Sequence, residues 1–259
     1  MSKWRPSDNC IFVIPDIHGM ADELELILNR ILPLRNSVKN RDTLVFLGDY
    51  IDRRVDSNKV VDIVLEVKSD FPDQTFCLLG NHEYLIQKAM DPSAPPEEYL
   101  TWMQNGGEHT LIGYLNRAKS ELNNPYLIRR NLISRFIPEE HLMFFKQLLP
   151  YYETDDYIFV HGGCDPFVPL EHQDVHTLIW DRSIYTQLRN FGKQWKCSWD
   201  KTIVTGHNGQ LDGKPFVCDG FYMLDGSYSQ KLYAWELNSK TGFSARANKK
   251  RLVKEKKLG

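Results

Sequence analysis

The first half of the chain alternates short apolar segments with longer amphipathic ones. Residues 10–15 (CIFVIP), 43–47 (TLVFL) and 74–79 (QTFCLL) are apolar and rich in β-branched or aromatic side chains, which predicts three strands. Between them, residues 21–32 and 58–68 carry apolar side chains at helical spacing. This βαβαβ pattern predicts a parallel sheet whose functional loops follow the carboxyl ends of the strands.

The pattern changes twice in the rest of the chain. Residues 91–150 read as helical and are expected to form a cap or insertion, with a helix over 139–149 leading into a strand at Tyr157–Val160. The last third returns to strands, which predicts an antiparallel or mixed second sheet. These strands are Thr202–Thr205, 221–224 and 231–237. We expect a single domain over residues 1–245.

Composition is that of a soluble globular protein. Of the 259 residues, 42% are hydrophobic and 25% are charged, and no apolar run approaches the roughly 20 residues of a membrane span. The N-terminus lacks the apolar core of a signal peptide, and the five cysteines are scattered without a CxxC pair. We therefore expect a cytoplasmic protein with free thiols and no membrane association.

The net charge of −2 is unevenly distributed. Residues 246–259 contain seven Lys or Arg and one Glu, so the remainder of the chain is acidic. We expect this basic tail to be disordered. Because nucleic-acid binding requires a basic face rather than a short tail, no nucleic-acid partner is expected.

Five predicted strands are followed by side chains that bind metals or transfer protons. In a sheet with parallel strands these exits converge, so they can assemble one site from distant residues. The five sequences are DIHG at 16–19, GDYIDR at 48–53, GNHE at 80–83, HGG at 161–163 and GH at 206–207.

The donors are oxygen and imidazole, without thiolates. This mixture suits manganese, iron or zinc better than calcium, which prefers oxygen ligands alone. The number of ligands fits two ions better than one. A carboxylate shared by two ions about 3.5 to 4 Å apart leaves room for a bridging water, whose pKa falls from 15.7 towards about 7. That water is a nucleophile at neutral pH.

In this order, the five motifs resemble those of the phosphoprotein phosphatase (PPP) family of metallophosphoesterases, and the bacterial and bacteriophage enzymes are nearest in length. The motifs span about three quarters of the chain, and GDxxDR followed by GNHE is highly specific. The resemblance implies an α/β, calcineurin-like fold, with two mixed sheets packed face to face and flanked by helices. It also implies hydrolysis of phosphate monoesters by a hydroxide that bridges two metal ions, with manganese favoured and iron or zinc as alternatives.

Carried over residue by residue, the resemblance implies a ligand set. Asp16 and His18 would hold the first ion, and Asp49 would bridge both. The remaining ligands, all of the second ion, would be Asn81, His161 and His207.

The resemblance also implies the catalytic groups. His82 matches the general acid that protonates the leaving oxygen, and Asp52 matches the carboxylate that orients it. Arg53 matches an arginine that binds the phosphoryl oxygens, as Asn81 also would. Arg182, just after Trp180-Asp181, is a candidate second phosphate-binding arginine.

Three positions depart from the family pattern without removing a ligand. Pro15 stands where many relatives have glycine, Arg54 where the family usually has the glycine of DRG, and Leu79 where eukaryotic protein phosphatases usually carry arginine. The last departure argues against a substrate of the eukaryotic type. Arg54 adds a cation beside Arg53, so we expect it to favour a multiply charged substrate.

Three functions follow from these motifs. The leading prediction is a serine/threonine protein phosphatase, acting on phosphorylated protein or a small phosphorylated or polyphosphorylated compound. A diadenosine tetraphosphate hydrolase shares the ligands, and the Asp52-Arg53 pair and GNHE favour the phosphatase. A catalytically silent binding module is the alternative of another class, and the complete set of ligands and acid argues against it.

Overall fold

Two sheets form the centre of the protein in this computed structural model, which describes residues 10–35, 42–122, 124–192, 199–209, 213–246 and 251–254. The first sheet has six strands in the order β11-β10-β9-β1-β2-β3, and the second has five in the order β4-β5-β6-β8-β7. The strands are β1 Ile11–Ile14, β2 Thr43–Phe46, β3 Thr75–Cys77, β4 Tyr151–Glu153, β5 Tyr157–Val160, β6 Thr202–Thr205, β7 Phe216–Cys218, β8 Phe221–Met223, β9 Leu232–Glu236, β10 Thr241–Arg246 and β11 Arg251–Lys254.

The parallel core predicted from the βαβαβ pattern is confirmed. β1 pairs with β2 and β2 with β3, all parallel, and the register places Val13 opposite Val45. The crossovers are α1 (Ala21–Arg35) and α2 (Ser57–Asp70), close to the predicted helices. All three strands therefore end at one edge of the sheet.

Three strands in the last third of the chain were predicted to form the second sheet. This prediction was wrong for one of them, which lies in the first sheet. β6 and β8 do lie in the second sheet, but β9 pairs antiparallel with β1 in the first. Pairing partners depend on how the chain returns across the core, which the local pattern of residues 231–237 does not contain. β4, β7 and β10 are additional strands that the sequence reading left out.

The sheets pack face to face through alternate side chains. Val13 and Val45 of the first sheet share a buried cluster with Phe159 and Val204 of the second. Because neighbouring residues of a strand point to opposite faces, Phe12 contacts the helix side instead. The two mixed sheets flanked by helices match the expected calcineurin-like architecture.

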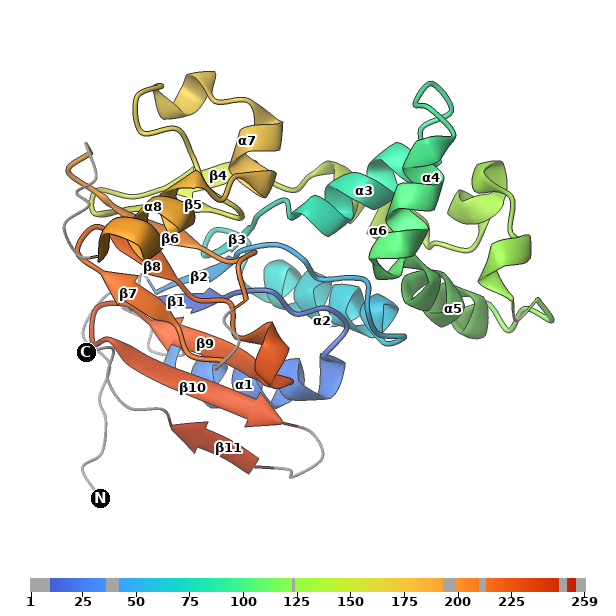
Figure 1. The fold of residues 1–259 in the computed structure, drawn as a ribbon. Coiled ribbons are helices and arrows are strands. Elements are labelled where there is room, and N and C mark those ends of the chain that lie inside the picture. Colours follow the sequence, from blue (N-terminus) through green and yellow to red (C-terminus); the bar gives the residue numbers. More distant parts are fainter. Residues whose placement is uncertain are drawn as a thin grey trace.

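Helices cover the outer faces, and a helical segment extends to one side of the sheets (Figure 1). α1 and α2 lie against the first sheet, whereas α7 and α8 lie by the second. The extension includes the helices of residues 91–150, the segment expected from the sequence to form a cap or insertion. Its elements and the other helices are α3 Asn81–Met90, α4 Glu97–Trp102, η1 Met103–Gly107, α5 Glu108–Arg117, η2 Pro125–Leu127, η3 Arg130–Arg135, α6 Glu139–Lys146, η4 Leu170–His172, α7 Val175–Trp180, α8 Ser183–Phe191 and η6 Ser227–Ser229.

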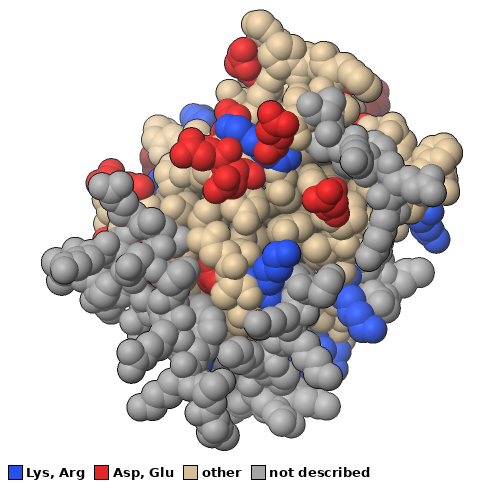
Figure 2. Space-filling model, turned by 90° about the vertical axis from the view of Figure 1, so that its left-hand side faces the viewer, with Lys and Arg blue, Asp and Glu red and all other residues tan. Residues whose placement is uncertain are grey.

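The basic C-terminal segment differs in part from its prediction. Arg251–Lys254, expected to be disordered, forms β11 and pairs antiparallel with β10; residues 247–250 and 255–259 lie outside the described part. On the face in Figure 2, acidic and basic side chains lie beside one another without a continuous basic stripe among the atoms described.

Four of the five cysteines can be examined. Cys10, Cys77, Cys164 and Cys218 are buried and form no disulfide with one another, and Cys197 lies outside the described residues. No helix among the described residues has the length and apolar character needed to cross a bilayer.

Candidate metal centre and active site

The predicted ligands lie where the strands of both sheets end. Asp16 follows β1, Asp49 follows β2 and Asn81 begins α3 after β3. In the second sheet, His161 directly follows β5 and His207 follows β6, which run parallel to each other. Since the sheets are stacked, the two sets of exits meet at one rim. All of these side chains except the partly exposed His207 are buried.

Several predicted site residues at this rim have positive φ angles, which strain the backbone. Among the described non-glycine residues, eight have positive φ, and five of these are predicted site residues. A non-glycine residue held in this region costs of order 1–3 kcal/mol and persists only where the surroundings impose it. Strain of this kind clusters at functional sites, which agrees with the position of the predicted ligands at this rim. The five are His18 (45°), Asp49 (53°), Asp52 (70°), Arg53 (66°) and His207 (61°).

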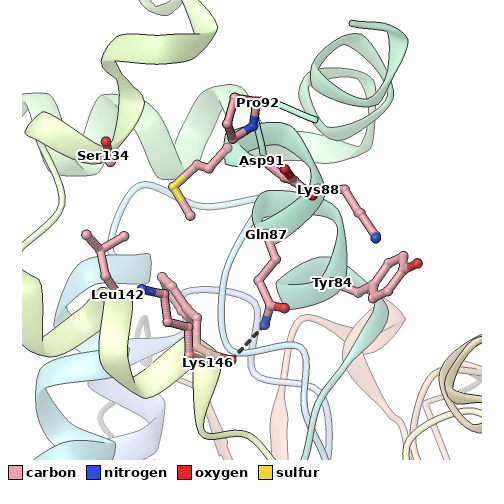
Figure 3. A pocket seen from close by; sticks show the side chains of 10 residues that line it. Tyr84, Gln87, Lys88, Asp91, Pro92, Ser134, Leu142 and Lys146 are labelled. Atoms are coloured by element: carbon pink, nitrogen blue, oxygen red, sulfur yellow. Dashed lines mark hydrogen bonds between the residues drawn. The ribbon is translucent and has the colours of Figure 1, made fainter. Parts of the chain in front are cut away.

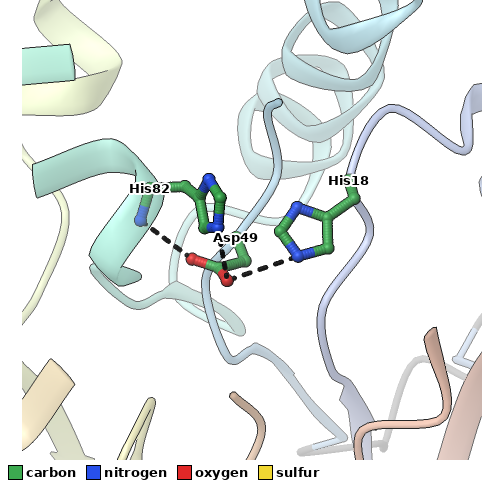
Figure 4. A group of neighbouring side chains, drawn as sticks. All are labelled: His18, Asp49 and His82. Atoms are coloured by element: carbon green, nitrogen blue, oxygen red, sulfur yellow. Dashed lines mark hydrogen bonds and ion pairs between the residues drawn. The ribbon is translucent and has the colours of Figure 1, made fainter. Parts of the chain in front are cut away.

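Asp49 lies at the centre of the rim, between two groups of candidate ligands. Its Oδ2 is 3.4 Å from Nε2 of His18 and 3.9 Å from Nε2 of His82. Its Oδ1 is 3.3 Å from Nε2 of His161. Figure 4 shows the carboxylate between the rings of His18 and His82. One carboxylate can therefore serve two adjacent cation sites.

The ligands predicted for the second ion converge on a single amide oxygen. Oδ1 of Asn81 is 2.9 Å from Nε2 of His161 and 2.9 Å from Nδ1 of His207. Asp16 completes the other side, with its Oδ2 3.9 Å from Nε2 of His18. The Oδ1 of Asp16 also accepts a hydrogen bond of 2.9 Å from the backbone N–H of His207, which ties the two sheets together.

Backbone carbonyls orient two of the imidazole rings. Nδ1 of His18 lies 2.9 Å from the carbonyl oxygen of Ile51, and Nδ1 of His161 lies 2.9 Å from that of Leu47. Because a carbonyl only accepts, each Nδ1 donates its proton to that carbonyl, and each Nε2 is the nitrogen that faces Asp49. Nε2 of His18 is buried and makes no hydrogen bond. An unpaired buried lone pair is what a metal ligand requires.

Burial and neighbouring charges shift the pKa values of the rim residues in both directions. Burial and the neighbouring Asp225 raise the pKa of Asp16 well above its usual value. Burial lowers the pKa of His161, but Asp49 and then Asp16 outweigh it and raise the pKa to about 9. By contrast, burial and the nearby His161 lower the pKa of His207 to about 3. The carboxylates therefore favour positive charge on His161, whereas burial keeps His207 a neutral imidazole.

His82 and Asp52 form a buried pair supported by the helical extension. Nδ1 of His82 is 2.7 Å from Oδ2 of Asp52. The other oxygen, Oδ1, accepts hydrogen bonds from the indole N–H of Trp102 at 3.1 Å and the hydroxyl of Thr110 at 2.7 Å. Burial lowers the pKa of His82, but Asp49 and Asp52 outweigh it and raise the pKa.

The two predicted phosphate-binding arginines lie at the exposed side of the rim. Nη2 of Arg53 is 3.2 Å from Nε2 of His82, and Nε of Arg182 is 3.1 Å from Nε2 of His207. Both side chains are exposed, unlike the ligands beneath them. Each guanidinium thus reaches the buried centre from the solvent side.

Four residues near the site were missed as functional residues. Trp102 and Thr110 are separated from Asp52 by 50 and 58 positions, so no local signal connects them. Glu83, although part of GNHE, was given no role; its carboxylate accepts the backbone N–H groups of Asp49, Tyr50, Ile51 and Gly80.

The fourth is Asp225, which is 2% exposed and lies two residues after β8. It shows the same signal as the predicted ligands, an acid at a strand exit.

A pocket separate from the predicted ligands lies in the helical extension. It has a volume of about 500 Å³ and lies between α3 and α6, with Tyr84 and Lys88 on one side and Leu142 on the other (Figure 3). Gln87 crosses its floor, donating to the carbonyl oxygen of Phe145 at 2.7 Å. No residue of the metal centre lines it.

Several curated proteins are similar to this chain, over different shares of its length. A bis(5'-nucleosyl)-tetraphosphatase of Oceanobacillus iheyensis is 24% identical, and the match covers 95% of both chains. A serine/threonine-protein phosphatase of Candida albicans is 33% identical over 32% of this chain and 26% of its own. This chain spans between 16% and 31% of the length of four of the curated relatives it matches.

Structure and family comparisons cover most of the chain. A solved structure provisionally assigned as a diadenosine tetraphosphatase has a TM-score of 0.59 at 19% identity, covering 93% of this chain and 95% of that one. At this identity the likeness concerns the fold alone. The profile of the calcineurin-like phosphoesterases matches residues 11–240. The chain therefore belongs to the calcineurin-like phosphoesterase family and is a hydrolase.

Proposed function

We propose that this protein hydrolyses phosphate monoesters with a pair of divalent cations held at the rim. The single observation that carries the proposal is the position of Asp49, whose two oxygens face separate groups of imidazoles. The unpaired Nε2 of His18 and the lack of thiolates at the rim fit borderline cations such as Mn²⁺, with Fe or Zn as alternatives. One ion is assigned to Asp16, His18 and Asp49, and the other to Asn81, His161, His207 and again Asp49.

When bound, the pair of cations supplies the Lewis acidity that lowers the pKa of a water enough for attack at neutral pH. The chain itself positions the substrate and handles the proton. Arg53 presents forked N–H donors to two phosphoryl oxygens. Arg182 adds a second guanidinium group where it approaches His207. Together they hold the ester with its leaving oxygen towards His82.

His82 is assigned the role of general acid. Its Nδ1 is held by Asp52 at 2.7 Å, so its Nε2 faces the rim and can carry a proton to the leaving alkoxide. Asp52 stabilises the imidazolium and fixes the ring orientation, as long as Trp102 and Thr110 hold the carboxylate in place.

Two substrate classes are candidates. Serine and threonine phosphoesters of proteins are favoured by the GDYIDR and GNHE motifs and by the His82–Asp52 pair, because an alkoxide leaving group needs an acid. A dinucleoside tetraphosphate is favoured by a different observation, the full-length match to a tetraphosphatase. The proposal for the cell is a cytoplasmic enzyme without a nucleic-acid or membrane partner.

The test is a comparison of three substrates. Protein stripped with chelator and resupplied with Mn²⁺ is given a phosphothreonine peptide, p-nitrophenyl phosphate and diadenosine tetraphosphate, with the stripped protein as control. We expect metal-dependent hydrolysis of at least the aryl phosphate and one natural substrate. Hydrolysis of the dinucleotide without the peptide would select the second class. Absence of metal-dependent hydrolysis of all three would refute the proposal.

A further inference from the structure

A small polar pocket opens beside the metal centre. It is lined by His18, Arg53, Arg54 and Ser227 and has a volume of about 170 Å³. At about 30 Å³ per water, this is room for several waters or one phosphoryl group. His18 belongs to both the pocket and the predicted ligand set, so a group held here lies next to the group under attack.

Arg54 is held in a fixed position at the wall of this pocket. Its Nη1 donates to the backbone carbonyl oxygen of His18 at 3.1 Å, and its side chain is half-buried. Gly19, with φ of 70°, lies directly against it, and a Cβ at that glycine would come within 2.8 Å of Cβ of Arg54. The remaining N–H groups of the guanidinium are free to bind a ligand.

The pocket brings together two neighbouring guanidinium groups, and the carboxylate of Glu23 partly offsets the charge of Arg54. Within the described chain, neither Arg53 nor Arg54 forms an ion pair with a carboxylate within 4.0 Å. The hydroxyl of Ser227 is buried at the same wall, next to the carboxylate of Asp225. The two adjacent guanidinium groups form a site complementary to an anion.

A phosphate monoester carries one phosphoryl group and does not contact all of these donors. Its single phosphoryl group would be bound by the metal centre and Arg53, which leaves Arg54 without a ligand group. We propose that the Arg54 pocket binds a second phosphoryl group, adjacent to the one attacked, so that the preferred substrates are oligophosphates such as dinucleoside tetraphosphates. The inference rests on the proposed hydrolysis and selects the second of its two substrate classes.

The reaction on such a substrate is a simple hydrolysis. Water adds its oxygen to the attacked phosphorus, and the bond from that phosphorus to the bridging oxygen breaks. The bridging oxygen leaves with its electron pair on the phosphoryl group held by Arg54, and both products leave as phosphates that share the two protons of water. No other reactant is needed.

The test compares Arg54→Ala with the intact enzyme on diadenosine tetraphosphate and p-nitrophenyl phosphate, both with excess Mn²⁺. We expect kcat/KM to fall about tenfold more for the tetraphosphate than for the aryl phosphate, because one charge-assisted hydrogen-bond donor is lost. Arg135→Ala, which removes an exposed guanidinium in η3, should leave the ratio of the two substrates unchanged.

Inhibition gives a second readout that needs no turnover of the tetraphosphate. Pyrophosphate should inhibit aryl phosphate hydrolysis more strongly than orthophosphate, and Arg54→Ala should remove this advantage. If Arg54→Ala does not fold, Arg54→Lys keeps the charge but loses the forked donors, and it should lower the same ratios. Equal losses on both substrates would overturn the inference. Hydrolysis of the aryl phosphate alone would overturn it while leaving the proposed hydrolysis intact, whereas hydrolysis of neither would refute both.

Discussion

His82 has two neighbours that suggest two different roles. Its Nε2 lies 3.9 Å from Asp49, in a cluster with His18 that could hold a metal ion. Its Nδ1 is bound to Asp52 at 2.7 Å, an arrangement found both for metal ligands and for catalytic acids. The geometry is consistent with both roles. They are distinguished by the activity and the metal content of a variant that lacks the imidazole ring.

His82→Asn tests the acid assignment. We expect kcat to fall by about 100-fold or more on an alkyl phosphate, because a proton no longer reaches the leaving oxygen. The loss should be smaller on p-nitrophenyl phosphate, whose leaving group needs less protonation. Metal content, measured by atomic emission on the purified protein, should be unchanged.

His172→Asn is the matched control, since His172 is exposed in η4 and remote from the predicted ligands in sequence. It should leave both rates intact. A fall in the metal content of His82→Asn would instead assign His82 as a ligand.

At the scale of elements, the helical extension determines how the GDYIDR loop is held. The π-helical turn η1 joins α4 to α5 and presents the carbonyl oxygen of Gly106 to the backbone N–H of Arg53 at 3.2 Å. Trp102 ends α4 and Thr110 lies in α5, and both donate to Asp52. The insertion thus supports the acid pair and the arginine from one side.

Trp102→Phe removes the indole N–H and keeps an aromatic ring in the core. We expect kcat on alkyl phosphates to fall about 3- to 10-fold, the effect of losing one hydrogen bond to a carboxylate, with a smaller change in KM. The ratio of alkyl to aryl phosphate rates, measured at constant metal, reports the acid step.

Trp235→Phe is the control, because the indole N–H of Trp235 makes no hydrogen bond in its buried position. It should lower the melting temperature without changing that ratio. Equal effects of the two variants on the ratio would show that Trp102 acts through packing alone.

Gly106→Ala tests the close approach of η1 to Arg53. Gly106 has φ of 103°, and a Cβ there would lie 2.8 Å from the backbone nitrogen of Arg53. We expect a loss of stability of about 1–3 kcal/mol and a rise in KM as Arg53 is displaced. Denaturant unfolding and steady-state kinetics measure the two effects.

Gly192→Ala provides a matched comparison, because Gly192 also has positive φ (63°) but, among the residues that the structure describes, no atom beyond its chain neighbours lies within 4 Å of its Cβ position. It should share the backbone strain and leave KM unchanged. An unchanged KM in Gly106→Ala would show that Arg53 is not positioned by η1.

At the scale of the whole molecule, the proposed metal centre joins the two sheets. Asp16, Asp49 and Asn81 follow strands of the first sheet, whereas His161 and His207 follow strands of the second. Ions bound by both sets would hold the sheets together at their common edge, and their binding energy would add to the free energy of unfolding.

Metal addition should therefore stabilise the chelator-stripped protein. At a Mn²⁺ concentration about 100 times the dissociation constant, the gain is about 2.7 kcal/mol, which thermal unfolding detects as a rise in melting temperature. Asp49→Asn should abolish most of this rise, since it weakens the carboxylate that faces both groups of ligands.

Asp219→Asn is its control, because Asp219 lies in the β7–β8 turn and not in the ligand set. It should keep the full metal-dependent rise. A full rise in Asp49→Asn would contradict the assignment of Asp49 as the shared ligand.

The sequence by itself identified the parallel βαβαβ core and the residues at the strand exits. Periodicity is a local property, so residues 10–79 gave strands and helices close to those observed. The same locality explains the failures: whether β9 paired with β1 or with the second sheet depended on strands more than 200 residues away. Short strands such as β4 and β7 carry too few residues for a pattern to emerge.

What the sequence determined is the chemistry available: six candidate ligands, an acid and its partner, and two arginines with a third beside them. What only the tertiary structure decided is their arrangement. The stacking of two sheets brought the exits of β1, β2, β5 and β6 to one rim, and the extension placed Trp102 and Thr110 on Asp52. The reason is that side-chain identity is fixed at each position, whereas convergence and burial arise from packing between segments that are distant along the chain.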